Sequence, residues 1–153
     1  MPHTAYASAV IGAPIEQVWP LFRDFNALSQ WHPGIRESRL EAGGRGDAVG
    51  SVRHLTLASP DPARPDFVRE QLLMLDDPGT ALRYSIIETS LPMRDYVAGV
   101  RMVSVTATGQ TFAEWWADFG VKPGAQLADV AALVSRGVFA AGLAALDRKL
   151  SAR

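Results

Sequence analysis

The sequence predicts an α+β fold in which a seven-stranded antiparallel sheet curves around one long C-terminal helix, with two short helices after the first strand. Three observations carry this prediction: an aromatic helical pattern near the start, strand-like runs separated by turn residues, and an alanine-rich helical pattern at the end. A sheet that leaves its apolar face to a single terminal helix tends to wrap around that helix. We therefore expect a container with an internal cavity.

The first strand and the short helices follow from local patterns. Residues 6–11 read as a strand, and Pro14 is suited to the first position of a helix. One apolar helical face is then formed by Ile15, Val18, Trp19, Phe22 and Phe25. Pro20 lacks a backbone donor and should kink or loosen this helix. A second short helix is expected over residues 27–31, ending at the His-Pro-Gly sequence of residues 32–34.

Turn residues divide the next part of the chain into the remaining strands. The glycine-rich turn at residues 43–46 and the proline-rich loop at residues 59–65 are two of these breaks. Further strands are expected from residue 35 onward and at residues 51–57, 67–75, 82–88, 96–108 and 111–119.

The C-terminal helix is predicted from an apolar stripe that runs to about residue 150. The stripe consists of Leu127, Val130, Val134, Val138, Ala141 and Ala145. Gly137 and Gly142 lie inside it, and each costs about 1 kcal/mol relative to alanine in helix propensity. Close approach to the sheet, or room for a ligand, is a physical reason for both.

Length and composition limit the class of protein. A chain of 153 residues fits a single domain over residues 1–153. Fifteen basic and sixteen acidic residues leave a net charge of −1 without a basic stripe, so no nucleic acid partner is expected. The start of the chain lacks a signal-peptide pattern, and no apolar run is expected to reach membrane-spanning length. We expect a cytoplasmic protein without membrane insertion.

Several kinds of chemistry find no support. The absence of cysteine excludes disulfides and thiolate chemistry. His3, His32 and His54 are not expected to converge, so no metal site is predicted. There is neither a Gly-x-Ser-x-Gly nucleophile turn nor a phosphate-binding loop, so hydrolase and nucleotide-binding functions rank low. No cofactor is expected.

Strand alternation suggests which side chains face the cavity. The inward sets are expected to be Arg53, Leu55 and Leu57; Val68, Glu70, Leu72 and Met74; Leu82, Tyr84 and Ile86; and Phe112, Glu114 and Trp116. Arg53, Glu70 and Glu114 would then form a charged cluster at the cavity floor, since buried carboxylates need partners. A self-satisfied structural ion pair is an equally favoured interpretation.

Several segments carry a resemblance that covers nearly the whole chain. They are residues 13–19 (APIEQVW), 31–33 (WHP), 50–53 (GSVR), 75–77 (LDD) and 84–87 (YSII). Together they resemble the helix-grip superfamily, which includes START domains, bacterial polyketide cyclase/dehydrase-like proteins and the plant abscisic-acid receptors. Residues 50–96 are similar to the receptor branch and its bacterial relatives. The resemblance implies a helix-grip fold that binds a hydrophobic ligand.

The receptor pattern is only partly kept. His32 stands where the receptors have the lysine that holds the hormone carboxylate, and residues 59–63 keep half of the gate motif. At the latch position, Met93 keeps only the apolar character of the third residue. The resemblance places Glu70, Glu114 and Tyr96 at polar pocket positions. Hormone reception is therefore not expected, whereas a cavity with a polar floor is.

The leading hypothesis is a carrier or sensor for a small hydrophobic, ring-bearing molecule. The expected ligand-binding residues are His32, Arg53, Leu55, Leu57, Glu70, Tyr84, Ile86, Met93, Tyr96, Glu114, Trp116, Val134 and Val138. The alternative is a polyketide cyclase/dehydratase-like enzyme in which Tyr96, His32 or Glu114 transfers a proton. A third hypothesis is a homodimerising module that uses the loops at residues 59–65 and 90–95. His32 has a competing interpretation as a residue that ends the second short helix.

Overall fold

The computed structural model describes residues 2–59, 61 and 63–151. Its described part forms one antiparallel sheet of seven strands in the order β1-β7-β6-β5-β4-β3-β2, packed against a long C-terminal helix. The elements are β1 (Ala5–Ile11), α1 (Ile15–Arg23), η1 (Leu28–Gln30), β2 (Ile35–Leu40), β3 (Val52–Leu57), β4 (Phe67–Asp76), β5 (Ala81–Thr89), β6 (Met93–Val105), β7 (Gln110–Val121), α2 (Leu127–Ala132), η2 (Leu133–Ala140) and α3 (Ala141–Ser151). The predicted fold class is confirmed.

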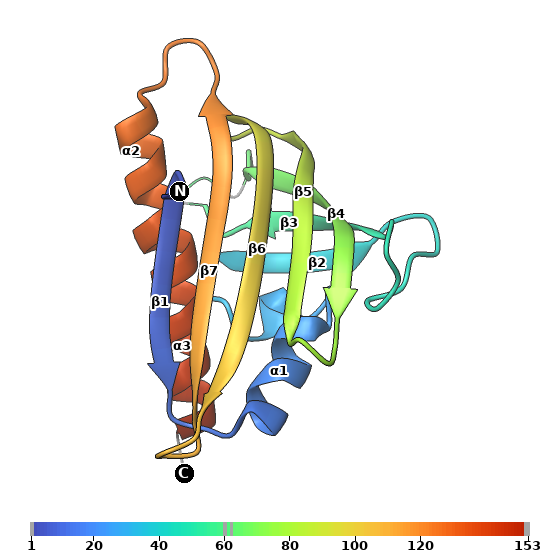
Figure 1. Ribbon diagram of the computed structural model, residues 1–153. Helices are drawn as coiled ribbons and strands as arrows, with labels where there is room; N and C mark the ends of the chain where they lie inside the picture. Colours follow the sequence, from blue (N-terminus) through green and yellow to red (C-terminus); the bar gives the residue numbers. More distant parts are fainter. Residues whose placement is uncertain (1, 60, 62, 152–153) are drawn as a thin grey trace.

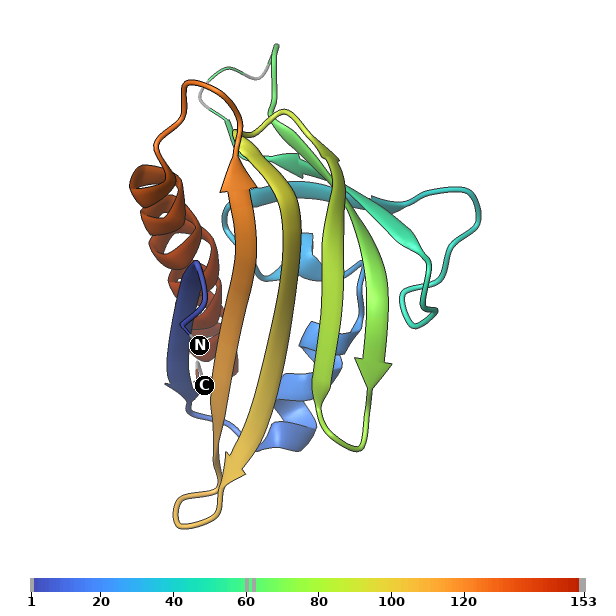
Figure 2. The same ribbon diagram turned by 45° about the horizontal axis from the view of Figure 1, so that its top comes forward.

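The sheet is strongly curved. Figures 1 and 2 show the continuous helix of α2, η2 and α3 running behind β1 and β7, while β2 and β3 turn behind β5 and β6. The short helix α1 lies near one end of the sheet and packs against β6, β7 and α3. The terminal helix thus covers the concave face at the β1 end of the sheet. At the other end, the curvature turns β2 and β3 back over this face.

Helix α1 differs in two details from the pattern that predicts it. Pro14 is the N-cap rather than the first helical residue, with an extended ψ of 151°. Pro20 lies inside the helix, which continues through it to Arg23. The helix ends before Phe25, yet that ring is completely buried. The predicted apolar face is therefore correct although its last member lies beyond the helix.

The middle of the terminal helix is wound more loosely than its ends. Residues Leu133–Ala140 form a π-helix, in which each backbone bond spans five residues instead of four. The inward positions consequently shift, so that Val134 is followed by Phe139 and Leu143 as the fully buried residues. Ala141, which the sequence placed on the buried stripe, is only partly buried for this reason.

The terminal helix corrects one expectation about apolar runs. By length and composition alone, the helix Leu127–Ser151 is long and apolar enough to cross a membrane. In the fold its apolar face covers the sheet instead, because Phe139, Leu143 and Leu146 are completely buried. Phe139 stacks on Trp115 of β7 with ring centres 4.6 Å apart. The cytoplasmic location stays a prediction.

Candidate ligand-binding cavity

A cavity lies between the concave face of the sheet and the terminal helix. Its volume is about 50 Å³, counted as the space that the centre of a water molecule can occupy. That is room for about four water molecules; a benzene ring occupies a cavity of about 150 Å³, so a ring-bearing ligand has to displace wall side chains. The walls are formed by Leu28, Ile35, Leu55, Leu57, Val68, Glu70, Tyr84, Ile86, Leu91, Met93, Tyr96, Trp115, Val134 and Val138. The cavity is thus largely apolar with a few polar groups, as small-molecule sites generally are.

A buried ion pair underlies one wall of the cavity. Arg53 of β3 and Glu70 of β4 are directly opposite in the antiparallel register, and only 4% and 6% of their surfaces are exposed. Arg53 Nε donates to Glu70 Oε1 at 2.8 Å, and Nη2 lies 2.7 Å from the same oxygen. Such a pair needs excellent geometry, since two ions have been removed from water.

The remaining contacts of Arg53 are with other protein groups. Its Nη1 donates to the backbone carbonyl of Phe25 at 2.9 Å. The guanidinium carbon lies 3.9 Å from the centre of the Phe25 ring and 5.1 Å from that of Tyr84, which are favourable cation–π positions. Burial raises the pKa of Glu70 above its ordinary value, while the charge and hydrogen bond of Arg53 act in the opposite direction.

Two buried tyrosines complete the polar part of the wall. Tyr84 accepts a hydrogen bond from Trp115 Nε1 at 2.9 Å, and Tyr96 stacks on Phe119 with ring centres 5.2 Å apart. Burial first, and the neighbouring Glu70 carboxylate in addition, raise the pKa of the Tyr84 hydroxyl; burial is also the main cause of the raised pKa of Tyr96. Both hydroxyls therefore stay protonated near neutral pH.

A β-bulge brings both Met93 and Tyr96 to the cavity. The pairing of β6 with β7 shifts between Arg94 and Val97. Met93 and Tyr96, although three residues apart, are consequently both buried on the inner face.

His32 is buried beside the cavity and does not line it. Its Nδ1 accepts a hydrogen bond from the backbone N–H of Gly34 at 3.0 Å, so the ring is the neutral tautomer that carries its hydrogen on Nε2. Nε2 lies 2.7 Å from the carbonyl oxygen of Val138 and donates to it. Burial lowers the pKa of His32 below its ordinary value. His32 thus ties the segment after η1 to the π-helix that covers the cavity.

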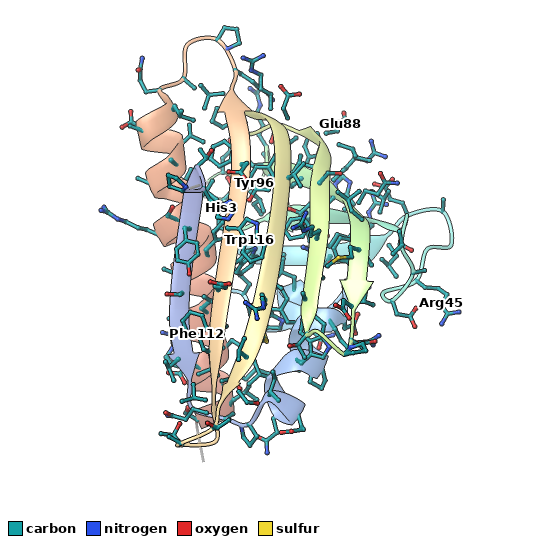
Figure 3. All side chains as sticks on the ribbon, in the orientation of Figure 1. His3, Arg45, Glu88, Tyr96, Phe112 and Trp116 are labelled. Atoms are coloured by element: carbon teal, nitrogen blue, oxygen red, sulfur yellow. The ribbon has the colours of Figure 1, made fainter. Side chains whose placement is uncertain are left out.

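Glu114 and Trp116 lie outside the cavity, which corrects the prediction for β7. Glu114 accepts a hydrogen bond from the Tyr6 hydroxyl at 2.7 Å, and Trp116 stacks on His3 with ring centres 5.3 Å apart (Figure 3). The inner face of β7 is instead formed by Thr111, Ala113, Trp115, Ala117 and Phe119. Both faces of this strand carry large apolar residues, so alternation alone does not reveal which face is inward.

The other expected residues divide into two groups. Those that line the cavity are Leu55, Leu57, Glu70, Tyr84, Ile86, Met93, Tyr96, Val134 and Val138. Arg53 and His32 are buried behind the wall, and their hydrogen bonds go to protein atoms. Lining residues outside the expected ligand-binding set are Leu28, Ile35, Val68, Leu91 and Trp115. Of these, strand alternation had already placed Val68 on the cavity-facing side of its strand.

The two loops that the dimer hypothesis uses, residues 59–65 and 90–95, are described unequally. Pro60 and Pro62 of the loop at residues 59–65 lie outside the described residues. The second segment, residues 90–95, contributes Leu91 and Met93 to the cavity wall.

A curved antiparallel sheet that grips a terminal helix over a largely apolar cavity defines the helix-grip class of protein. The chain belongs to the family described as "Polyketide cyclase / dehydrase and lipid transport", whose sequence model matches residues 2–151.

Individual relatives agree with this assignment. The chain is 32% identical to the abscisic acid receptor PYL2 of Arabidopsis thaliana over 93 residues, which are 61% of this chain and 47% of the receptor. The match therefore spans about half the length of that relative. Among solved structures, the protein XoxI of Bacillus cereus shares 29% identity with a TM-score of 0.81, covering 99% of this chain and 97% of XoxI. Ginseng major latex-like protein 151 of Panax ginseng, at 13% identity and a TM-score of 0.75 over 95% of both chains, shares the fold.

Proposed function

We propose that the protein binds a small hydrophobic, ring-bearing molecule in the cavity and acts as its carrier or sensor. The observation that carries the proposal is the cavity itself: a largely apolar space whose described wall includes one buried carboxylate and two phenol hydroxyls. The family description includes lipid transport, and the plant relative is by name a receptor for a small molecule, so both support it.

The enzymatic alternative is weaker on the geometry of its expected residues. Glu114 lies on the outer face, and both ring nitrogens of His32 are engaged by Gly34 and Val138. Tyr96 reaches the cavity, but its raised pKa makes it a poor proton donor or acceptor near neutral pH. Binding without turnover is therefore the function that we favour. The homodimer stays a separate prediction.

Two measurements test the proposed function. Native mass spectrometry of the purified protein should detect a retained small molecule, or a mass increase when toluene is added. In the variant Val134→Phe the added ring fills the cavity, so toluene binding measured by calorimetry should fall at least about tenfold. The matched control is Val103→Phe on the outer face, where Val103 is 41% exposed, and it should bind like the wild type. Equal binding by all three proteins would refute the cavity as the site.

A further inference from the structure

We infer that the ligand is an uncharged molecule that donates a hydrogen bond, such as a phenol or an alcohol, to Glu70, and that the cavity rejects carboxylates. This inference rests on the proposed function and adds the chemical class of the ligand. It depends on how the Arg53–Glu70 pair divides its hydrogen-bonding groups between the protein and the cavity.

Each guanidinium nitrogen of Arg53 contacts a protein oxygen. Arg53 gives Nε to Glu70 and Nη1 to the Phe25 carbonyl, while Nη2 lies against the same Glu70 oxygen. Its guanidinium plane is covered by the Phe25 ring. Arg53 is not part of the cavity wall. A ligand in the cavity therefore meets the carboxylate of this pair and not its guanidinium.

One oxygen of that carboxylate faces the cavity. Both short contacts from Arg53 go to Oε1, and no hydrogen bond between described residues involves Oε2. In the described part of the chain, every fully buried side-chain oxygen or nitrogen has a hydrogen-bond partner. Since Oε2 has no such partner, it is not fully buried. Because Glu70 is also a wall residue, Oε2 keeps surface that is open to the cavity. Oε2 can therefore accept a hydrogen bond from a ligand in the cavity.

The charge around the cavity favours a neutral donor. Among the described wall residues Glu70 is the one ionisable acid or base other than tyrosine, and Arg53 already balances its charge. A ligand carboxylate would place a second negative charge beside Oε2 without a cation of its own. A ligand ammonium would pay the cost of leaving water for an apolar space, and the carboxylate that it meets already has its charge balanced by Arg53. A hydroxyl completes the acceptor at neither cost.

Four single-ring probes of similar size test this selectivity by calorimetry at pH 7: phenol, toluene, benzoate and benzylammonium. Phenol and toluene have nearly the same shape, and only phenol donates a hydrogen bond. Hydrogen bonds to charged groups are stronger than neutral ones, so phenol should bind at least about tenfold more tightly than toluene. Benzoate and benzylammonium should each bind at least about tenfold more weakly than phenol.

The variant Glu70→Gln assigns the selectivity to this side chain. With its amide oxygen toward Arg53, glutamine turns its NH₂ group to the cavity and replaces the acceptor by a donor. The preference for phenol over toluene should then fall to less than about twofold. The matched control is Glu88→Gln, because Glu88 pairs with Arg69 at 2.8 Å with its side chain 58% exposed, and the phenol preference should be unchanged. Circular dichroism checks that both variants fold.

The outcomes separate the two proposals. If phenol and toluene bind the wild type equally, or if benzoate binds most tightly, the ligand class is wrong while binding in the cavity stands. If none of the four probes binds, the proposed function fails and the ligand class with it. Should Glu70→Gln not fold, the wild-type ratio of phenol to toluene affinity decides alone.

Discussion

Breaking the Arg53–Glu70 pair from one side should destabilise the protein far more than removing the whole pair. In Arg53→Met the Glu70 carboxylate stays 94% buried without its counter-ion, which costs about 3–5 kcal/mol. The Phe25 carbonyl also loses the Nη1 hydrogen bond, which adds about 1 kcal/mol. We therefore expect the free energy of unfolding of Arg53→Met to fall by about 4–6 kcal/mol.

The double variant Arg53→Met with Glu70→Leu leaves no buried charge. Apolar residues that replace a buried ion pair are often neutral in their effect on stability. The double variant should thus recover at least about 2 kcal/mol relative to Arg53→Met, although the Phe25 carbonyl remains without this donor. An exposed control pair, Arg45 with Asp47, has side chains 75% and 41% exposed, so Arg45→Met should cost less than about 1 kcal/mol.

Urea unfolding followed by tryptophan fluorescence gives these free energies for all four proteins. The reasoning is refuted if Arg53→Met costs less than about 1 kcal/mol, or if the double variant is as unstable as the single one. Either result would mean that Glu70 finds water or another partner once Arg53 is gone.

Three further predictions follow from the other contacts. Gly142→Ala would place a Cβ 2.6 Å from His32 Cδ2, so the free energy of unfolding in urea should fall by about 1–3 kcal/mol. In Gly137→Ala the new Cβ lies 3.4 Å from its nearest neighbour, so this variant should stabilise the helix by up to about 1 kcal/mol. Equal destabilisation by both substitutions would contradict this reasoning. Burial lowers the pKa of His32 in the folded state, so the contribution of His32 to stability is complete above pH about 7 and is lost as the pH falls through about 6.5, the pKa of an unfolded histidine. His32→Gln should reduce this part of the dependence of unfolding free energy on pH. An unchanged pH dependence in the variant would contradict the prediction. Glu114→Gln should change phenol affinity less than twofold because Glu114 bonds Tyr6 on the outer face, and a larger loss would reopen its place in the site.

Strand alternation predicted the inward side chains in the first part of β4, where Glu70 and Leu72 are inward and Arg69 on the opposite face pairs with Glu41. It was wrong for Met74, because the β-bulge between Leu72 and Met74 brings Leu75 against the core instead.

In β7 the adjacent residues Trp115 and Trp116 offer a large aromatic ring to each face. Packing across the concave face decides between them: Phe139 of the terminal helix stacks on Trp115, and Phe22 of α1 meets the same ring edge-on.

Two features of the site arise from contacts that no local pattern records. The π-helix changes the helical period, so a stripe drawn at regular spacing drifts off the buried side after Val134. The role of His32 depends on Val138, a residue 106 positions away along the chain. The fold was therefore predictable from periodicity and turns, whereas the partners of individual polar groups required the packed structure.

Methyl shifts in NMR spectra, followed while phenol is added to the wild-type protein, test ligand binding in the cavity most directly. The methyl groups of Leu55, Val134 and Val138 line the cavity, while Val10 and Val103 are 51% and 41% exposed on the outer face of the sheet. We expect saturable shifts of the three cavity residues and none of the two outer valines. Shifts confined to the outer valines, or none at all up to the solubility limit of phenol, would contradict the proposal that the cavity is a binding site.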